Sequence, residues 1–296
     1  MIDGVRAPRR TELAITLTAA LAVIVSPAVA PASRVTHRLR GAQGSRGAPA
    51  TRVTPLYRPV GCVRRGPSVA YTHGPRRRVV ALSFDDGPWP DTPAFVRLLE
   101  REHVPATFFL IGGQVTDRYR SLLRRELRDG DALGDHTFTH PYLTRTGDVR
   151  GQLQRTITAI RAQTNFTPCV FRPPYGAYSG SVVATARALH MATVLWNVDP
   201  RDYTRPGVGA IASRVLAQVH PGSIVLSHDG GGPREQTLAA CGHIIRVLRA
   251  RGYRFVTVPQ LLGFHNVYER CRRTCIGEGI HGPLPRRSVL RHRPAR

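Results

Sequence analysis

Four residues in the middle of the chain have side chains of the types that bind transition metals. Asp85 and Asp86 directly follow an apolar run, residues 79–84, and His136 and His140 are four positions apart. If the two histidines sit on a helical turn, their imidazoles share one face. Two imidazoles and one carboxylate make a metal site with open positions for water and substrate. The ordinary alternative is that the two aspartates cap a helix or close a turn.

Three later segments carry further charged or ionisable side chains. Arg172 precedes two prolines, Asp199 and Asp202 lie in one short stretch, and His228 follows an apolar run. Taken alone, Arg172 could be one more of many arginines, and His228 could be a surface or capping histidine. Their positions make them candidates, because each follows a stretch with the pattern of a strand.

From residue 79 to about residue 264 the chain alternates between strand and helix patterns. Short apolar runs typical of buried strands alternate with segments whose apolar residues recur at helical spacing. The expected strands are 79–84, 106–111, 131–134, 169–171, 193–198, 223–227 and 254–258. The expected helices are 92–103, 117–128, 148–163, 181–190, 208–219 and 235–251, with Gly130 as a C-cap.

Repeated strand–helix units predict an α/β protein whose parallel sheet is covered by helices on both faces. A (β/α) barrel is the economical closure, and an open doubly wound sheet is the alternative. In a parallel barrel the C-terminal ends of the strands converge on one site, and the polar clusters fall at those ends. No G-x-G-x-x-G or Walker sequence follows the first strand, so nothing supports nucleotide binding.

The order of the clusters resembles the polysaccharide deacetylase (NodB-homology) family, carbohydrate esterase family 4, over about residues 78–262. Five family motifs appear in order, and Tyr203 stands where the family has tryptophan. The matches are Phe84 to Gly87 for Phe-Asp-Asp-Gly, His136 to His140 for His-Thr/Ser-x-x-His with Pro141 after it, Arg172 to Tyr175 for Arg-x-Pro-Tyr, Asp199 to Tyr203 for Asp-x-x-Asp-Trp, and Leu226 to His228 for Leu-x-His.

This resemblance implies a distorted (β/α) barrel of the NodB-homology type that removes an N- or O-acetyl group from a sugar with the help of a divalent metal. It implies Asp86, His136 and His140 as metal ligands. The other implied roles are general base for Asp85, orientation of that base for Arg172, general acid for His228, orientation of that acid for Asp202, an oxyanion donor for the Tyr175 backbone N–H, and walls of the substrate groove for Tyr203 and Leu226.

The chemistry of acetamide hydrolysis agrees with these roles. The carbonyl is a poor electrophile and water is a poor nucleophile, and a divalent metal activates both. Zinc is the expected ion from the ligand types, although cobalt, nickel or manganese would also fit. Asp202 would favour the protonated form of His228, which can then protonate the leaving amine.

The leading prediction is a monomeric, metal-dependent hydrolase that removes the N-acetyl group of N-acetylglucosamine residues in peptidoglycan or chitin-like oligosaccharides. An acetyl-xylan esterase of the same family is the nearest alternative, because ester and amide hydrolysis can use the same centre. A catalytically silent wall-binding module is a third hypothesis, although the sequence replaces neither the base nor a metal ligand.

The chain is strongly basic. Its 43 basic residues, all arginine, against 19 acidic residues give a formal net charge of +24. Nucleic acid is the usual first partner to consider for such a charge. We expect no nucleic-acid partner, because the N-terminus has a secretion pattern and no RRM, helix-turn-helix or finger pattern is present. Anionic wall polymers are the expected electrostatic partners instead.

The N-terminus has the composition of a secretory signal peptide. Arginines precede an apolar stretch, Leu13–Val25, and Ala28–Ala30 supplies a small-x-small cleavage pattern. We therefore expect a secreted, extracellular protein, with association with the cell wall or the membrane as a further option. The expected divisions are 1–30 (signal peptide or uncleaved anchor), 31–75 (flexible basic linker), 76–265 (catalytic domain) and 266–296 (basic tail with cysteines).

The chain has five cysteines, and secretion would allow disulfides among them. An odd number leaves at least one thiol unpaired in a monomer, and the connectivity does not follow from sequence. Cys271 and Cys275 are close enough for a local bridge. Cys169 and Cys241 are expected to be buried free thiols, and Cys62 has no assigned partner.

Overall fold

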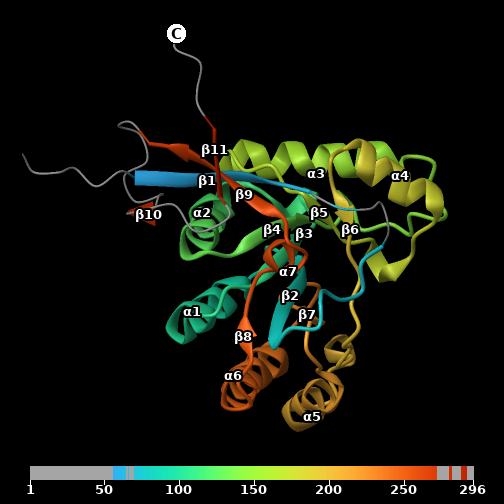
Figure 1. Ribbon diagram of the computed structural model, residues 1–296. Helices are drawn as coiled ribbons and strands as arrows, with labels where there is room; N and C mark the ends of the chain where they lie inside the picture. Colours follow the sequence, from blue (N-terminus) through green and yellow to red (C-terminus); the bar gives the residue numbers. More distant parts are fainter. Residues whose placement is uncertain (1–55, 65, 67–69, 272–279, 282–287, 292–296) are drawn as a thin grey trace, which may run out of the picture. The chain divides into compact units, whose positions relative to one another are not determined.

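The computed structural model describes residues 56–64, 66, 70–271, 280–281 and 288–291 (Figure 1). The chain divides into a unit Met1–Thr51, which lies wholly outside the described residues, and a unit Arg52–Arg296, which holds every described element. The predicted signal peptide falls in the first unit. None of the helices in the described part of the chain has the length and apolar character that crossing a bilayer requires.

The second unit is built around a parallel sheet. Its strands are short and mostly apolar, as expected where helices cover both faces of a sheet. Each predicted strand region overlaps one observed strand, although the predicted strand 193–198 shares only Thr193 with β6. In spatial order these are β6 (Ala192–Thr193), β5 (Val170–Phe171), β4 (Ala132–Asp135), β3 (Thr107–Leu110), β2 (Val79–Gly87) and β7 (Ser223–His228), with β8 (Arg254–Phe255) paired to β2.

The two edges of this sheet meet just beyond the end of β6. Val198 forms a parallel bridge with Val225 of β7. The Leu226 N–H donates to the Val198 carbonyl at 2.9 Å, and the Val198 N–H donates to the Ile224 carbonyl at 3.3 Å. The sheet therefore curls into a distorted barrel, as the sequence predicted, and is not an open doubly wound sheet.

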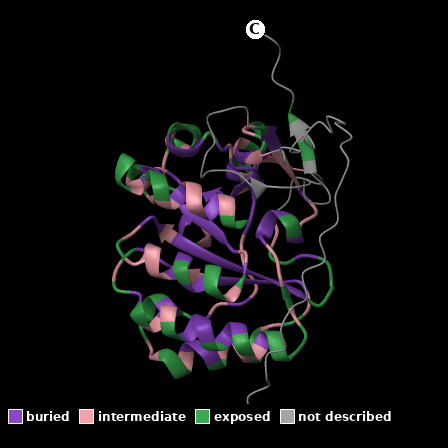
Figure 2. Cartoon of the chain, turned by 90° about the vertical axis from the view of Figure 1, so that its left-hand side faces the viewer, coloured by how far each residue is buried: buried purple, intermediate pink, exposed green. Residues whose placement is uncertain are grey.

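Helices surround the barrel, and their inward sides are buried while their outward sides are exposed (Figure 2). Phe84 of β2 packs against Phe95 and Phe108 with ring centroids 5.1 and 5.3 Å apart, at the centre of the core. The helices are α1 (Thr92–Glu102), α2 (Arg120–Asp129), α3 (Val149–Thr164), α4 (Gly180–Ala188), α5 (Val208–Gln218), α6 (Glu235–Ala250) and α7 (Val258–Leu261), with 3-10 turns η1 (Gly112–Gln114), η2 (Asp117–Tyr119), η3 (Pro174–Gly176) and η4 (Asp202–Thr204).

A second, four-stranded sheet joins the two ends of the described chain. Strand β1 pairs with β9 in antiparallel fashion, and the order is β10-β1-β9-β11 (Figure 1). Strand β1 lies inside the segment predicted as a linker, and most of β9 lies inside the predicted tail. Both segments are thus partly structured in this protein. The strands are β1 (Leu56–Val63), β9 (His265–Arg270), β10 (Ile280–His281) and β11 (Ser288–Arg291).

A disulfide ties this second sheet to the barrel. Cys62 of β1 is bonded to Cys169, the residue before β5. The expectation of a free thiol at Cys169 is therefore wrong, whereas Cys241 is a buried free cysteine as predicted. Cys271 is also disulfide-bonded, and Cys275, its suggested partner, lies outside the described residues.

Candidate active site

The predicted metal ligands come together at the C-terminal ends of β2 and β4. Asp86 Oδ1 lies 3.5 Å from His136 Nε2 and 3.3 Å from His140 Nε2, and the three ligand atoms lie within 4.8 Å of one another. Ligands at about 2 Å from a tetrahedral ion are separated by roughly 3.3 Å, so these spacings fit one small cation. Among the described residues, the buried Asp86 Oδ1 accepts no hydrogen bond. The three side chains could therefore hold a metal ion.

The remaining ring nitrogens fix the direction of both imidazoles. His136 Nδ1 donates to the Arg172 carbonyl at 2.8 Å, and His140 Nδ1 lies 3.1 Å from the Tyr175 hydroxyl. Each contact leaves Nε2 pointing toward Asp86, the arrangement that metal-binding histidines need. Burial alone would raise the pKa of Asp86, but the contacts with the two imidazoles keep it well below its usual value.

The histidines do not sit on a helical turn, so that sequence expectation is wrong. They lie on a loop in which Thr137 has φ +68° and His140 has φ +58°. Gln152 of α3 clamps this loop: its Oε1 accepts from the Phe138 and Thr139 N–H groups, both at 2.9 Å. These hydrogen bonds stabilise a left-handed backbone that brings the two rings together.

The predicted base and its arginine form a buried ion pair. Arg172 Nη1 donates to Asp85 Oδ1 at 2.8 Å and to Ser83 Oγ at 2.8 Å, and Nη2 donates to the Leu195 carbonyl at 3.0 Å. The Arg172 side chain is 0% exposed and the Asp85 side chain 4% exposed. The Arg172 guanidinium also lies 4.1 Å from the centre of the Phe109 ring. Arg172 therefore holds the Asp85 carboxylate in one orientation.

The predicted acid forms a second buried pair. His228 Nδ1 lies 2.8 Å from Asp202 Oδ1, and the His228 N–H donates to Asp202 Oδ2 at 2.8 Å. The Thr237 hydroxyl donates to the same Oδ2 at 3.0 Å. Burial alone would lower the pKa of His228, but the hydrogen bond and the charge of Asp202, helped by the carboxylates of Asp85 and Asp86, raise it to about 9.

Strand register brings the two pairs side by side. In the parallel pairing of β2 and β7, Asp85 is the cross-strand partner of His228. The two strand ends approach closely, because a Cβ on Gly230 would lie 2.0 Å from the Asp86 carbonyl oxygen. Glycine is thus needed at position 230, and the acid, the base and the ligand Asp86 share one end of the barrel.

Of the other predicted site residues, two lie at the rim and one does not. Tyr175 and Tyr203 are 56% and 47% exposed, and the Tyr203 ring lies edge-on to His228 at 5.6 Å. Leu226 was expected in the groove wall but is 3% exposed, because it lies inside β7 between Ser83 and Val198. The structure therefore does not bring the Leu226 side chain to the exposed rim.

Sequence reasoning missed three residues that support the site. Gln152 holds the histidine loop, Thr237 holds Asp202, and Tyr142 stacks on Tyr175 with ring centroids 3.9 Å apart. The signal for Gln152 and Thr237 was a polar residue on the apolar face of a helix, since both are buried. Tyr142 had no distinguishing signal in the sequence.

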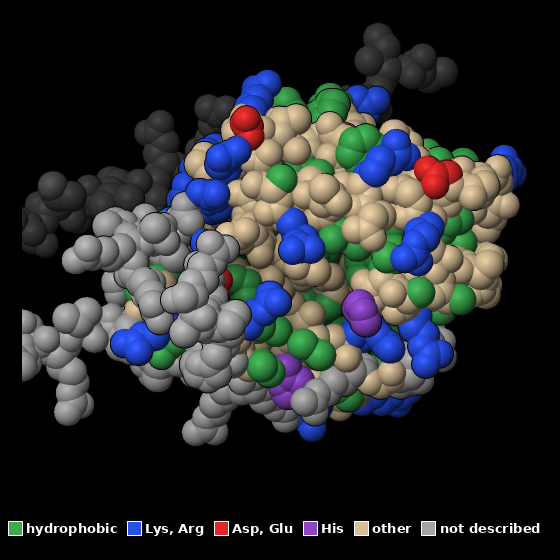
Figure 3. Space-filling model, turned by 90° about the horizontal axis from the view of Figure 1, so that it is seen from above, with side chains coloured by type: hydrophobic (Ala, Val, Ile, Leu, Met, Phe, Trp, Pro, Cys, Tyr) green, Lys and Arg blue, Asp and Glu red, His purple; other side chains and the backbone are tan. Residues whose placement is uncertain are grey.

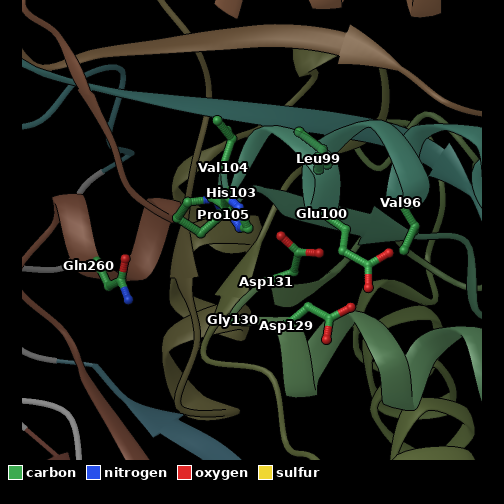
Figure 4. Close-up of a pocket in the computed structure, with 10 residues that line it drawn as sticks. All are labelled: Val96, Leu99, Glu100, His103, Val104, Pro105, Asp129, Gly130, Asp131 and Gln260. Atoms are coloured by element: carbon green, nitrogen blue, oxygen red, sulfur yellow. The ribbon is translucent and has the colours of Figure 1, made fainter. Parts of the chain in front are cut away.

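A cavity of about 400 Å³ lies at the opposite end of the barrel (Figure 4). It is bounded by the segments that precede β3 and β4, and its carboxylates are Glu100, Asp129 and Asp131. Burial raises the pKa of Asp131 to about 8. None of the residues of the candidate active site lines this cavity.

Known proteins share this fold and these motifs. The profile of the polysaccharide deacetylase family matches residues 72–194. A chitooligosaccharide deacetylase of Sinorhizobium fredii is 43% identical over 195 residues, which cover 61% of this chain and 90% of the relative. A crystal structure of a peptidoglycan N-acetylglucosamine deacetylase aligns with a TM-score of 0.63 at 31% identity, covering 66% of this chain and 92% of that one.

The same fold also occurs in a CE4-family pseudoenzyme of Bacillus anthracis, with a TM-score of 0.62 at 30% identity over 67% of this chain and 70% of that chain. The fold by itself therefore does not establish activity, which depends on the residues of the site. The similarity in sequence and in structure, together with the five ordered motifs, shows that this chain belongs to the polysaccharide deacetylase family.

Proposed function

We propose that this protein is a secreted, zinc-dependent hydrolase that removes the acetyl group from N-acetylglucosamine residues of chitin oligomers or peptidoglycan. The observation that carries the proposal is the register of β2 and β7, which sets Asp85 beside His228. One strand end thus presents a carboxylate paired with an arginine, and the next presents an imidazole paired with a carboxylate. Amide hydrolysis needs one such base and one such acid.

In this proposal Asp85 accepts the proton of the attacking water. Its Oδ1 is engaged by Arg172, which leaves Oδ2 for the proton. His228 then donates a proton to the nitrogen of the leaving amine as the carbon–nitrogen bond breaks. The raised pKa of His228 supports this role, because the imidazole is protonated at neutral pH. The Tyr175 backbone N–H donates to the oxyanion of the tetrahedral intermediate.

Asp86, His136 and His140 would hold the metal, and zinc suits a donor set of two imidazoles and one carboxylate. A bound zinc ion polarises the acetyl carbonyl and lowers the pKa of a water molecule. The contact with the Arg172 carbonyl keeps the Nε2 lone pair of His136 available, and the contact with the Tyr175 hydroxyl turns His140 Nε2 toward Asp86. Tyr203, exposed beside His228, is proposed to form one wall of the sugar groove.

Export and wall association are also part of the proposal. The signal-peptide pattern of residues 1–30 and the net charge of +24 support a monomer that works outside the cell near anionic wall polymers. Arginine side chains are spread over the face of the molecule in Figure 3, with few acidic side chains among them. Binding to isolated walls should therefore weaken as the salt concentration rises.

The test is acetate release by the metal-loaded full chain from N-acetylchitotetraose, peptidoglycan and acetyl-xylan. We expect release from at least one of the first two, and a loss of about 10²–10⁴-fold in the Asp85→Asn variant. Asp117→Asn is the matched control, because this exposed aspartate pairs only with Arg120 among the described ion pairs. Release from acetyl-xylan alone would favour an esterase, and no release from any substrate would favour a silent binding module.

A further inference from the structure

A column of side chains leads outward from the metal site. The His140 ring lies edge-on to Tyr175 with centroids 4.7 Å apart, and Tyr175 stacks on Tyr142 at 3.9 Å and 11°. The Arg145 guanidinium then lies 5.1 Å from the centre of the Tyr142 ring. Because Tyr175 occupies one face of Tyr142, Arg145 must lie over the other face.

The backbone holds Arg145 in this place. The Arg145 N–H donates to the Tyr142 carbonyl at 2.9 Å, which closes a turn and brings the Arg145 side chain back over the ring. The cation–π contact adds an attraction between the guanidinium and the Tyr142 ring. The guanidinium is thus oriented before any ligand arrives, which lowers the entropy cost of binding.

The charge of Arg145 is available for a ligand. Within the described part of the chain, its guanidinium takes part in none of the observed hydrogen bonds or ion pairs. Asp148, the next acidic residue along the chain, accepts from the Gly151 N–H at the start of α3 and lies 3.4 Å from Arg155. Tyr142 and Tyr175 are 44% and 56% exposed, so the column is open to solvent along its edge.

We propose that Arg145 binds an acidic substituent of the glycan, carried by a sugar next to the one that is deacetylated. This inference rests on the proposed deacetylase function and specifies its substrate class. Tyr175 and Tyr142 lie between the metal ligand His140 and Arg145, so a group bound by Arg145 would lie beyond the sugar at the metal site. A planar guanidinium suits a carboxylate, which it can bind through two parallel hydrogen bonds.

The proposal separates two kinds of acetylated glycan. Chitin oligomers carry no carboxylate, so Arg145 should make no ion pair with them. Peptidoglycan carries carboxylates in two forms: the lactyl group of its muramic acid residues, once the peptide has been removed, and the acidic residues of the attached peptides. Arg145 should therefore contribute to binding of peptidoglycan fragments and be neutral for chitin oligomers.

The experiment compares the zinc-loaded wild type with Arg145→Gln on three substrates: N-acetylchitotetraose, glycan strands freed of peptide, and strands that keep their peptides. We expect KM to rise by about threefold to tenfold on an acidic substrate with kcat nearly unchanged, as for a partly exposed ion pair. The effect should shrink as the salt concentration rises. The acidic substrate whose KM rises in Arg145→Gln identifies the source of the carboxylate.

Arg187→Gln is the charge-matched control, because Arg187 is exposed in the last turn of α4, which in a (β/α) barrel faces the other end. Tyr142→Ala removes the ring under Arg145 and should raise KM on the acidic substrate at least as much as Arg145→Gln does. If Arg145→Gln changes KM equally on neutral and acidic substrates, or if Arg187→Gln changes KM in the same way, the proposal is overturned. A wild type that releases acetate from no substrate would instead refute the deacetylase function itself.

Discussion

The pairing of His228 with Asp202 predicts how activity depends on pH. Three donors converge on the Asp202 carboxylate, at distances of 2.8, 2.8 and 3.0 Å. The Asp202→Asn variant keeps the size of this side chain but removes its charge. Burial, which lowers the pKa of His228, is then opposed only by the weaker attraction of Asp85 and Asp86. We expect the pKa of His228 to fall below its ordinary value.

The magnitude follows from the raised pKa. A change from 6.5 to about 9 corresponds to about 3 kcal/mol at roughly 1.4 kcal/mol per pKa unit. A general acid works in its protonated form, so activity is lost as the pH rises through this pKa. A metal ion would offset the charges of the carboxylates, so about 9 is an upper bound for the alkaline limb. If the pKa falls to about 6, the protonated fraction at pH 8 falls by about a hundredfold.

The assay is kcat/KM for acetate release from N-acetylchitotetraose between pH 5 and pH 10, with metal content and circular dichroism checked for each variant. Asp202→Asn should move the alkaline limb to lower pH, by about two pH units or more where the wild-type limb lies near pH 9. Thr237→Val is the control, because it removes one hydrogen bond to Asp202 and no charge. A folded, metal-bound Asp202→Asn variant with an unchanged alkaline limb would refute the assignment of His228 as the acid.

Three further changes test the metal site, the disulfide and a buried acid. His140→Ala should weaken zinc binding by more than about a hundredfold in a competition with a chelating dye, and unchanged affinity would contradict the site. Replacing both Cys62 and Cys169 by serine opens a link across 107 positions and should lower the free energy of unfolding in urea by about 2–5 kcal/mol. The pKa of Asp131 is raised by burial from 3.8 to about 8, so its ionisation destabilises the folded state as pH rises through that range. Asp131→Asn should therefore raise Tm more at pH 8 than at pH 5, and an equal change at both values would contradict this.

Strands and helices of the barrel were predictable because their residues carry a periodic signal. The run 79–84 falls within β2, and helix α2 ends at Asp129 with Gly130 as its C-cap, whose φ of +100° suits the predicted role. The strand-end clusters were predictable for the same reason, since parallel topology places them at one end. This is why the sequence could place Asp85 and His228 in one site without any contact being known.

What the sequence did not predict depends on contacts between distant segments. The left-handed φ values of Thr137 and His140 are stabilised by Gln152, and no pattern within residues 136–140 predicts that contact. Strand β1 is interrupted by Pro59 and Gly61 and was assigned to a linker, but pairing with β9 and a disulfide from Cys62 stabilise it. Leu226 matched a family motif, yet a motif does not say which way a strand residue faces.

The two ion pairs explain how one site can hold an acid and a base at the same pH. Arg172 is fully buried against Asp85 and holds the Asp85 carboxylate in one orientation. Asp202 is buried against His228 and favours the protonated imidazole. Because Asp85 and His228 are cross-strand partners, the charge of Asp85 also favours the protonated imidazole. Removing either outer partner should therefore disturb both groups, so the double variant Arg172→Gln, Asp202→Asn should lose less activity than the product of the two single losses predicts.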